Sequence, residues 1–190
     1  MIAHVLERIM RSLEWPLVYK QALLKAILKD LNEETFRPIS LLPCLSKVHE
    51  SFIANLLKED VRKRQILSDA QFGGRPNSST EDVVMHTILD VSKSIDQGQH
   101  VLILYINIAK AFDRIDHSVM MEVLKDYKVP SKLTQLIDSY LKERSYFIKS
   151  AGGVFKPIKS EHGGPQVSVL LPLLWSLHIN PLVDASHCSD

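Results

Sequence analysis

The sequence predicts an α+β domain, and three observations support this fold class. Apolar residues recur at intervals of three and four in several segments, as they do in amphipathic helices. A short apolar run follows His100, and two alternating runs flank Gly152 and Gly153, which is typical of a buried strand and of a hairpin. Helices and strands do not alternate regularly along the chain, so a doubly wound parallel sheet is not expected.

The composition is that of one folded domain. The chain has 190 residues, of which 45% are hydrophobic and 24% are charged. The 23 Lys and Arg against 22 Asp and Glu give a formal net charge of +1, so the overall charge does not indicate a nucleic-acid partner, although a local basic face stays open. Cys44 and Cys188 are too few and too far apart for a disulfide framework or a metal knuckle, which favours a reducing, intracellular compartment, cytoplasmic or nuclear. No apolar run reaches about 18 residues, so we expect neither a secretory signal nor a membrane anchor.

The first part of the chain is expected to be mainly helical. Residues 1–31 have helical spacing interrupted at Pro16, although residues 23–28 also fit a short buried strand. An extended, proline-punctuated segment follows, and then a helix from about 44 to 66. Its expected apolar face consists of Leu45, Val48, Phe52, Ile53, Leu56, Leu57 and Val61. Its last turns carry Lys58, Arg62, Lys63 and Arg64, which form either a solvated helix end or a contact for phosphate.

Residues 68–80 contain two Gly, three Ser, a Pro and an Asn and predict a loop that ends at a helix start, with Ser79 or Thr80 as the N-cap. That helix has a narrow apolar stripe (Val84, Ile88, Val91 and Ile95) and a stop signal at Gly98. Residues 101–106 then predict a buried central strand. Two helices over 118–127 and 131–144, a hairpin over 145–160, and an apolar helix with Pro172 in or near its first turns complete the chain.

Asn107 stands at the end of the predicted central strand, where a side chain is delivered to an open cleft. The backbone N–H groups of Ile108 and Ala109 follow it and could meet an anion. An acid at position 107 would be a ligand for a divalent metal ion, and sites with two metal ions need such carboxylates to offset the charge of the ions. Asparagine can ligate one ion weakly but brings no charge.

Four segments resemble successive blocks of the reverse transcriptase of non-LTR (LINE-type, jockey-like) retrotransposons, in the family's order and spacing. They are "TFRPISLLPCLSKVHESFIANLLK", "ILSDAQFGGRPNSSTEDVV", "VLILYINIAKAFDRIDH" and "GGPQVSVLLPLLWSLHINPL". The resemblance covers the chain from about residue 15 to its end. It implies a right-hand polymerase fold within one domain, with an N-terminal extension and fingers-like region over 1–100 and a partial palm over 101–190 that lacks the catalytic hairpin and thumb.

The resemblance also implies site residues, cofactors and partners. Asn107 occupies the position of the first metal-binding aspartate, and Arg75 matches an arginine expected near the triphosphate. Phe112 matches the aromatic residue that crowds the sugar 2′ position, and Gln166 matches a residue that lines the incoming nucleotide and the template. The implied cofactor is Mg²⁺, and the implied partners are an RNA template and a DNA primer.

The sequence departs from the family pattern at several positions. Gly74 stands in place of phenylalanine, Val167 and Leu171 in place of glycine and serine, and Pro181 in place of aspartate. The family's hairpin with two further aspartates would follow the last residues, "DASHCSD". We therefore expect no intact catalytic residue and no productively bound Mg²⁺.

Three functions stay open at this point: a degenerate and inactive RNA-directed DNA polymerase, a non-catalytic remnant that binds nucleic acid or protein, and a decayed reading frame without a selected role.

Asp113 and Asp116 could substitute as metal ligands, but structural or helix-capping roles are favoured. A branched side chain at Val167 would oppose the close approach of backbone to a nucleotide. Because a palm sheet without its hairpin leaves an edge or an apolar face uncovered, we also expect self-association.

Overall fold

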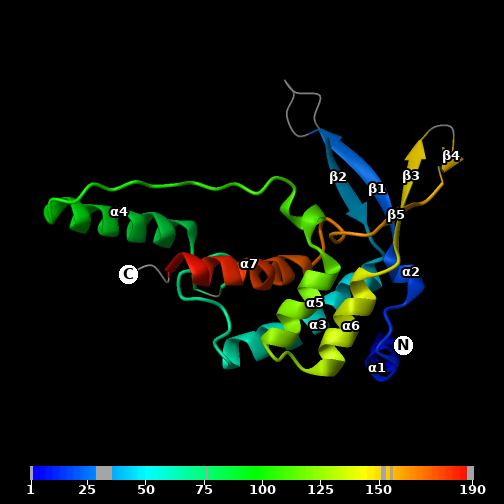
Figure 1. Ribbon diagram of the computed structural model, residues 1–190. Helices are drawn as coiled ribbons and strands as arrows, with labels where there is room; N and C mark the ends of the chain where they lie inside the picture. Colours follow the sequence, from blue (N-terminus) through cyan, green and yellow to red (C-terminus); the bar gives the residue numbers. More distant parts are fainter. Residues whose placement is uncertain (1, 29–35, 76, 151–152, 155, 188–190) are drawn as a thin grey trace.

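The structure is a computed structural model that describes residues 2–28, 36–75, 77–150, 153–154 and 156–187. It contains both helices and a mixed sheet, as the sequence predicts (Figure 1). The helices are α1 (Ile2–Ser12), α2 (Leu17–Lys20), α3 (Cys44–Lys63), α4 (Thr80–Asp96), α5 (His117–Asp126), α6 (Ser131–Leu141) and α7 (Leu171–His187), with a short 3₁₀ helix η1 (Ala111–Arg114).

The sheet joins two strands near the N-terminus with strands from residues 144–160. Strand β1 (Gln21–Leu28) pairs antiparallel with β2 (Phe36–Leu41) and parallel with β3 (Arg144–Ser150). Strand β3 also pairs antiparallel with β4 (Gly153–Val154) and β5 (Ile158–Ser160). Of the two possibilities for residues 23–28, the strand is therefore the one observed. The predicted hairpin is present as β3 with β4 and β5, while residues 151–152 and 155 lie outside the described part of the chain.

The core lies between α3, α5, α6 and the first half of α7. Helices α5 and α6 contact each other, and α5 also contacts α7 (Figure 1). The largest fully buried apolar side chains include Ile53, Leu57, Ile115, Met120, Leu124, Leu136, Ile137, Leu141 and Leu170. Helix α6 ends near the start of β3, so the helical core and the sheet are directly linked through Arg144.

The buried face of α3 differs from the expected one. Ile53, Leu57 and Val61 are buried as predicted, but Leu45, Val48, Phe52 and Leu56 are exposed. Ser46, His49 and Glu50 are buried in their place. The apolar spacing could not select this face, because the burial of these polar residues depends on partners from distant parts of the chain.

The predicted buried strand at 101–106 is wrong. These residues have no regular structure and are exposed, Leu102 to 95% and Tyr105 to 83%. A strand needs a neighbour for its backbone N–H and C=O groups, and the sheet seen in the described residues is formed by other segments. The expected stripe on α4 is likewise uncovered: α4 has no buried residue and projects away from the helical core (Figure 1).

The ends of α4 are nevertheless those predicted from the sequence. Ser79 is the N-cap and forms a capping box with Asp82, in which the Ser79 side chain accepts from the Asp82 N–H and the Asp82 carboxylate accepts from the Ser79 N–H. These hydrogen bonds lower the pKa of Asp82. Gly98, with φ +73°, follows the helix end. None of the described helices has both the length and the apolar character that crossing a membrane requires.

Candidate functional site

A glycine-rich turn that precedes α7 is joined to η1 by backbone hydrogen bonds. The Gly163 N–H donates to the Ile115 carbonyl at 2.8 Å, and the Gly164 N–H donates to the Phe112 carbonyl at 3.2 Å. His117 Nε2 lies 2.8 Å from the Gly163 carbonyl oxygen. Gly163 has φ +68°, and a Cβ there would lie 2.6 Å from the Phe112 carbonyl oxygen. Only glycine allows this close approach, so the turn and η1 are positioned as a unit.

This arrangement brings Gln166 and Phe112 into one region of the molecule. Gln166 Nε2 lies 3.3 Å from each carboxylate oxygen of Asp113, the residue that follows Phe112. The Phe112 ring packs edge-on against Trp175 of α7, with 6.2 Å between ring centroids. Two of the five candidate nucleotide-binding residues, Phe112 and Gln166, thus lie on adjoining segments, although each also has a structural contact.

A buried polar network anchors the same turn to α3. The Glu50 carboxylate, fully buried, accepts from Ser46 Oγ at 3.2 Å, Ser168 Oγ at 2.9 Å and the Val169 N–H at 3.0 Å. Ser168 Oγ also lies 2.7 Å from the Tyr140 hydroxyl. Burial, together with the Glu50 carboxylate, raises the pKa of Tyr140 above its usual 10.0. These residues were not predicted from the sequence, and the available signal was an acid, Glu50, on the same side of α3 as Ile53 and Leu57.

Val167 lies inside this anchored turn with φ +77°. Side chains with a branched Cβ rarely adopt this left-handed conformation, because of clashes with the backbone. Hydrogen bonds of Gly163 and Gly164 hold the turn before Val167, and Glu50 holds it after Val167 through Ser168 and Val169. These contacts keep Val167 in a left-handed conformation that favours glycine.

Asn107, Ile108 and Ala109 lie apart from regular structure. All three are exposed and precede Lys110, which has φ 54°. Because the expected strand at 101–106 is absent, the Asn107 side chain is not held at a strand end.

The residues near Asn107 do not fit the Mg²⁺ site that the resemblance implies. The Asn107 amide is neutral, and the two oxygens of Asp113 face the Gln166 amide. The Asp116 carboxylate caps α5 by accepting from Ser118 Oγ and from the Ser118 and Val119 N–H groups, which lower its pKa. Within the described residues no group of three or more His, Cys, Asp or Glu side chains is placed to hold a metal ion.

Arg75 lies on a different surface. Its Nη1 donates to the Ser68 carbonyl at 2.9 Å, and its Nη2 lies 3.0 Å from Asp69 Oδ1. The adjoining Gly74 has φ +77°, which favours glycine, and a Cβ there would lie 2.6 Å from Ser176 Oγ of α7 and would displace that hydroxyl. Arg75 lines a pocket of about 940 Å³ beside α3, which does not include Phe112 or Gln166.

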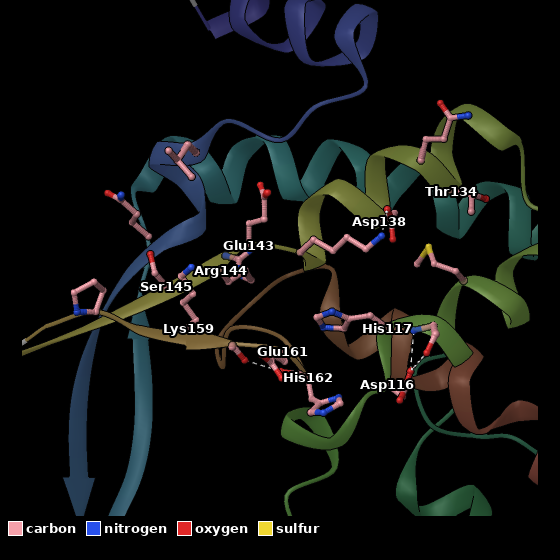
Figure 2. Close-up of a pocket in the computed structure, with 18 of the residues that line it drawn as sticks. Asp116, His117, Thr134, Asp138, Glu143, Arg144, Ser145, Lys159, Glu161 and His162 are labelled. Atoms are coloured by element: carbon pink, nitrogen blue, oxygen red, sulfur yellow. Dashed lines mark hydrogen bonds and ion pairs between the residues drawn. The ribbon is translucent and has the colours of Figure 1, made fainter.

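A larger pocket of about 1320 Å³ lies between the sheet and helices α5 and α6 (Figure 2). Its lining includes Asp116 but not Asn107 or any of the five candidate nucleotide-binding residues. Acidic and basic side chains alternate over its surface, among them the pair of Asp138 with Lys142 at 2.7 Å. Lys159 and Glu161 add one charge of each sign, so the pocket does not present a field of one sign to a charged ligand.

The chain belongs to the reverse transcriptase family. The family model described as "Reverse transcriptase (RNA-dependent DNA polymerase)" matches residues 27–187.

Within this family, the chain is related to the polymerases of jockey-like non-LTR retrotransposons, which confirms the resemblance seen in the sequence. It is 32% identical over 195 residues to the probable RNA-directed DNA polymerase from transposon BS of Drosophila melanogaster, a match that covers 100% of this chain and 21% of that protein. It is 30% identical over 191 residues to the corresponding protein of the X-element, covering 97% of this chain and 21% of that protein. The RNA-directed DNA polymerase from mobile element jockey of Drosophila funebris is 30% identical over 156 residues, which is 82% of this chain and 17% of that protein. The chain thus spans about a fifth of the length of these curated relatives.

A solved structure has the same fold. The apo telomerase from Candida tropicalis, truncated from its C-terminal domain, matches with a TM-score of 0.56 and 14% identity. The match covers 87% of this chain and 39% of that one.

Proposed function

We propose that this chain is the fingers and partial palm of a reverse transcriptase, which binds an RNA template and a DNA primer but does not synthesise DNA as the 190-residue chain. The proposal assigns the fingers to residues 1–100 and the partial palm to 101–190 of one domain. Pairing of β1 with β3 across this division supports their treatment as one domain. Arg75, Ile108, Ala109, Phe112 and Gln166 are the proposed nucleotide-binding residues.

Asn107 is the observation that carries the proposed inactivity. A pair of unit charges about 4 Å apart interacts with on the order of 4 kcal/mol at an effective dielectric constant of about 20. An amide in place of the carboxylate removes that charge from a doubly charged ion. Because about 4 kcal/mol of transition-state stabilisation corresponds to roughly a thousandfold in rate, one such replacement is sufficient to suppress catalysis.

Primer extension tests the catalytic part of the proposal. The purified chain is incubated with a primed RNA template, deoxynucleotides and Mg²⁺ or Mn²⁺, beside an active reverse transcriptase as the positive control. We expect no extended primer in either metal. Template-dependent extension would overturn the argument from Asn107.

RNA binding tests the second part. We expect the chain to bind single-stranded RNA with an affinity that falls as salt is added, as measured by fluorescence anisotropy. Binding no tighter than the weak non-specific range, about 10⁻⁴ to 10⁻⁶ M at physiological salt, would count against a role in holding nucleic acid.

A second candidate function is association with protein, and exposed apolar residues favour it. Leu102, Leu104 and Ile106 are 95%, 78% and 74% exposed. Contiguous apolar surfaces of this kind mark sites of protein association, and an extended segment with free backbone groups can add to another strand.

Sedimentation velocity over a range of protein concentrations tests this candidate. We expect a concentration-dependent increase in sedimentation coefficient that is weakened by Leu102→Lys. Gln99→Lys adds the same charge to the same exposed segment and is expected to have little effect. A monomer at all concentrations would refute self-association.

A further inference from the structure

The pocket that contains Arg75 is formed by the second half of α3 and by the loop that precedes α4. Its polar lining consists of Asn55, Lys58, Glu59, Arg62, Gln65, Arg75 and Asn77, with Gly74 and three apolar residues between them. Lys58 and Arg62 are four residues apart on α3, so their side chains lie on one face of the helix. The loop brings Arg75 to the same pocket.

Ion pairs divide the basic cluster at the end of α3 into two parts. Lys63 lies 2.9 Å from Glu59, and the hydrogen bond and charge of Lys63 lower the pKa of Glu59. Arg64 pairs with Asp60 and donates to the carbonyl groups of Tyr127 and Lys128. These two basic residues therefore have structural roles at the helix end.

Lys58 and Arg62 are the other part of the cluster. Both are exposed, and neither forms an ion pair within the described residues. The only acid that lines the described pocket, Glu59, is already paired with Lys63 outside it. The pocket thus presents two available cations together with Arg75, whose charge is shared with Asp69.

We propose that this groove binds the sugar-phosphate backbone of a single RNA strand, with Lys58 and Arg62 each contacting a phosphate. Lys, Arg, Asn and Gln side chains are the usual donors to phosphate and sugar oxygens, and the groove combines all four. Its described lining contains no aromatic side chain on which a base could stack. The contact is therefore to the backbone and independent of the RNA sequence. This assignment rests on the proposed function and adds to it Lys58 and Arg62 of α3, which line the same pocket as Arg75.

Salt-dependent RNA binding gives the expected size of the effect. Each phosphate contact on a single strand contributes about 0.7 to the slope of log K against log salt concentration. Loss of two contacts should reduce the slope by about 1.4 and weaken binding about 25-fold at about 0.1 M salt. Loss of one should reduce the slope by about 0.7 and weaken binding about fivefold.

The experiment measures anisotropy of a fluorescein-labelled single-stranded RNA with the whole chain and three variants. Lys58→Gln/Arg62→Gln removes both proposed contacts, and Lys58→Gln alone removes one. Arg8→Gln/Lys132→Gln is the matched control, since it removes the same charges from exposed positions on α1 and α6 outside both pockets. All variants should melt like the unmodified chain, because the replaced side chains are exposed.

We expect the Lys58/Arg62 variant to lose about 25-fold and the single variant about fivefold, with less than a twofold change in the Arg8/Lys132 control. Equal losses in the double variant and its control would overturn the groove while leaving RNA binding intact. No RNA binding by the unmodified chain would refute the proposed nucleic-acid role as well. Unlabelled RNA and uridine monophosphate are also compared as competitors at equal phosphate concentration. If uridine monophosphate competes as strongly as the RNA, the groove does not recognise an RNA strand and the proposal is overturned.

Discussion

Replacement of Val167 tests whether the turn before α7 is held in a strained conformation. Val167 has φ +77° and is 53% exposed. A residue other than glycine in this region is destabilised by on the order of 1–3 kcal/mol. Val167→Gly relieves that strain, but it also removes about 0.7 kcal/mol of apolar contact from a half-exposed valine. Glycine further loses roughly 0.5–1 kcal/mol through its greater freedom in the unfolded chain.

Comparison with Val167→Ala separates these effects. Both substitutions remove the valine methyl groups, but alanine keeps a Cβ and therefore keeps the strain. At an ordinary backbone position glycine is less stable than alanine by roughly 0.5–1 kcal/mol. At a positive φ the order inverts, so we expect Val167→Gly to be more stable than Val167→Ala by about 1 kcal/mol. For a chain of this size that is about 2–4 °C in melting temperature.

Urea unfolding followed by circular dichroism measures the two free energies of unfolding. The control pair is Val169→Gly and Val169→Ala, since Val169 is 37% exposed and is not among the residues with positive φ. There alanine should be the more stable variant. If Val167→Ala is at least as stable as Val167→Gly, the turn does not hold residue 167 in the left-handed conformation, which would refute the expected strain.

Three further variants test the buried network and the candidate metal position. Glu50→Ala leaves the Ser168 hydroxyl and the Val169 N–H without their buried acceptor, so we expect the free energy of unfolding to fall by about 3 kcal/mol in urea titrations; a loss below about 1 kcal/mol would contradict the network. Because the pKa of Tyr140 is raised above 10.0 by burial, its contribution to stability is fully present below pH 10 and is lost as pH rises. Tyr140→Phe should therefore flatten the decline in melting temperature above about pH 10 and leave it unchanged at lower pH; an unchanged decline above about pH 10 would assign it to other groups. Asn107→Asp should leave the melting temperature unchanged, because residue 107 is exposed. It should yield no product in primer extension, because the two further aspartates that the family resemblance implies are not among the 190 residues; product from this variant alone would show that one carboxylate is sufficient.

Local signals in the sequence predicted the features that depend on neighbouring residues. The N-cap at Ser79 and the helix stop at Gly98 are set by hydrogen bonds and backbone angles within a few residues. The break between α5 and α6 at Val129 and Pro130 is similarly local. The predicted strand at 101–106 depended instead on a partner strand, which residue order and hydrophobicity cannot supply.

The face of α3 was misassigned for a related reason. The helix has apolar residues on two adjacent stripes, so spacing alone allowed either to be buried. Glu50 decides the choice through a contact with Ser168, which is 118 residues away. A carboxylate is normally placed on the solvated side of a helix, and only the distant hydroxyl and N–H donors make its burial favourable.

The fold and the proposed metal chemistry depend on separate sets of residues. Glu50, Ser168 and Tyr140 are buried, and loss of their hydrogen bonds would destabilise the domain. Asn107 is exposed and lies outside the helices and strands, so an amide at this proposed metal-binding position has no cost in folding. The fold and the proposed loss of the catalytic charge can therefore be measured independently, by unfolding and by primer extension.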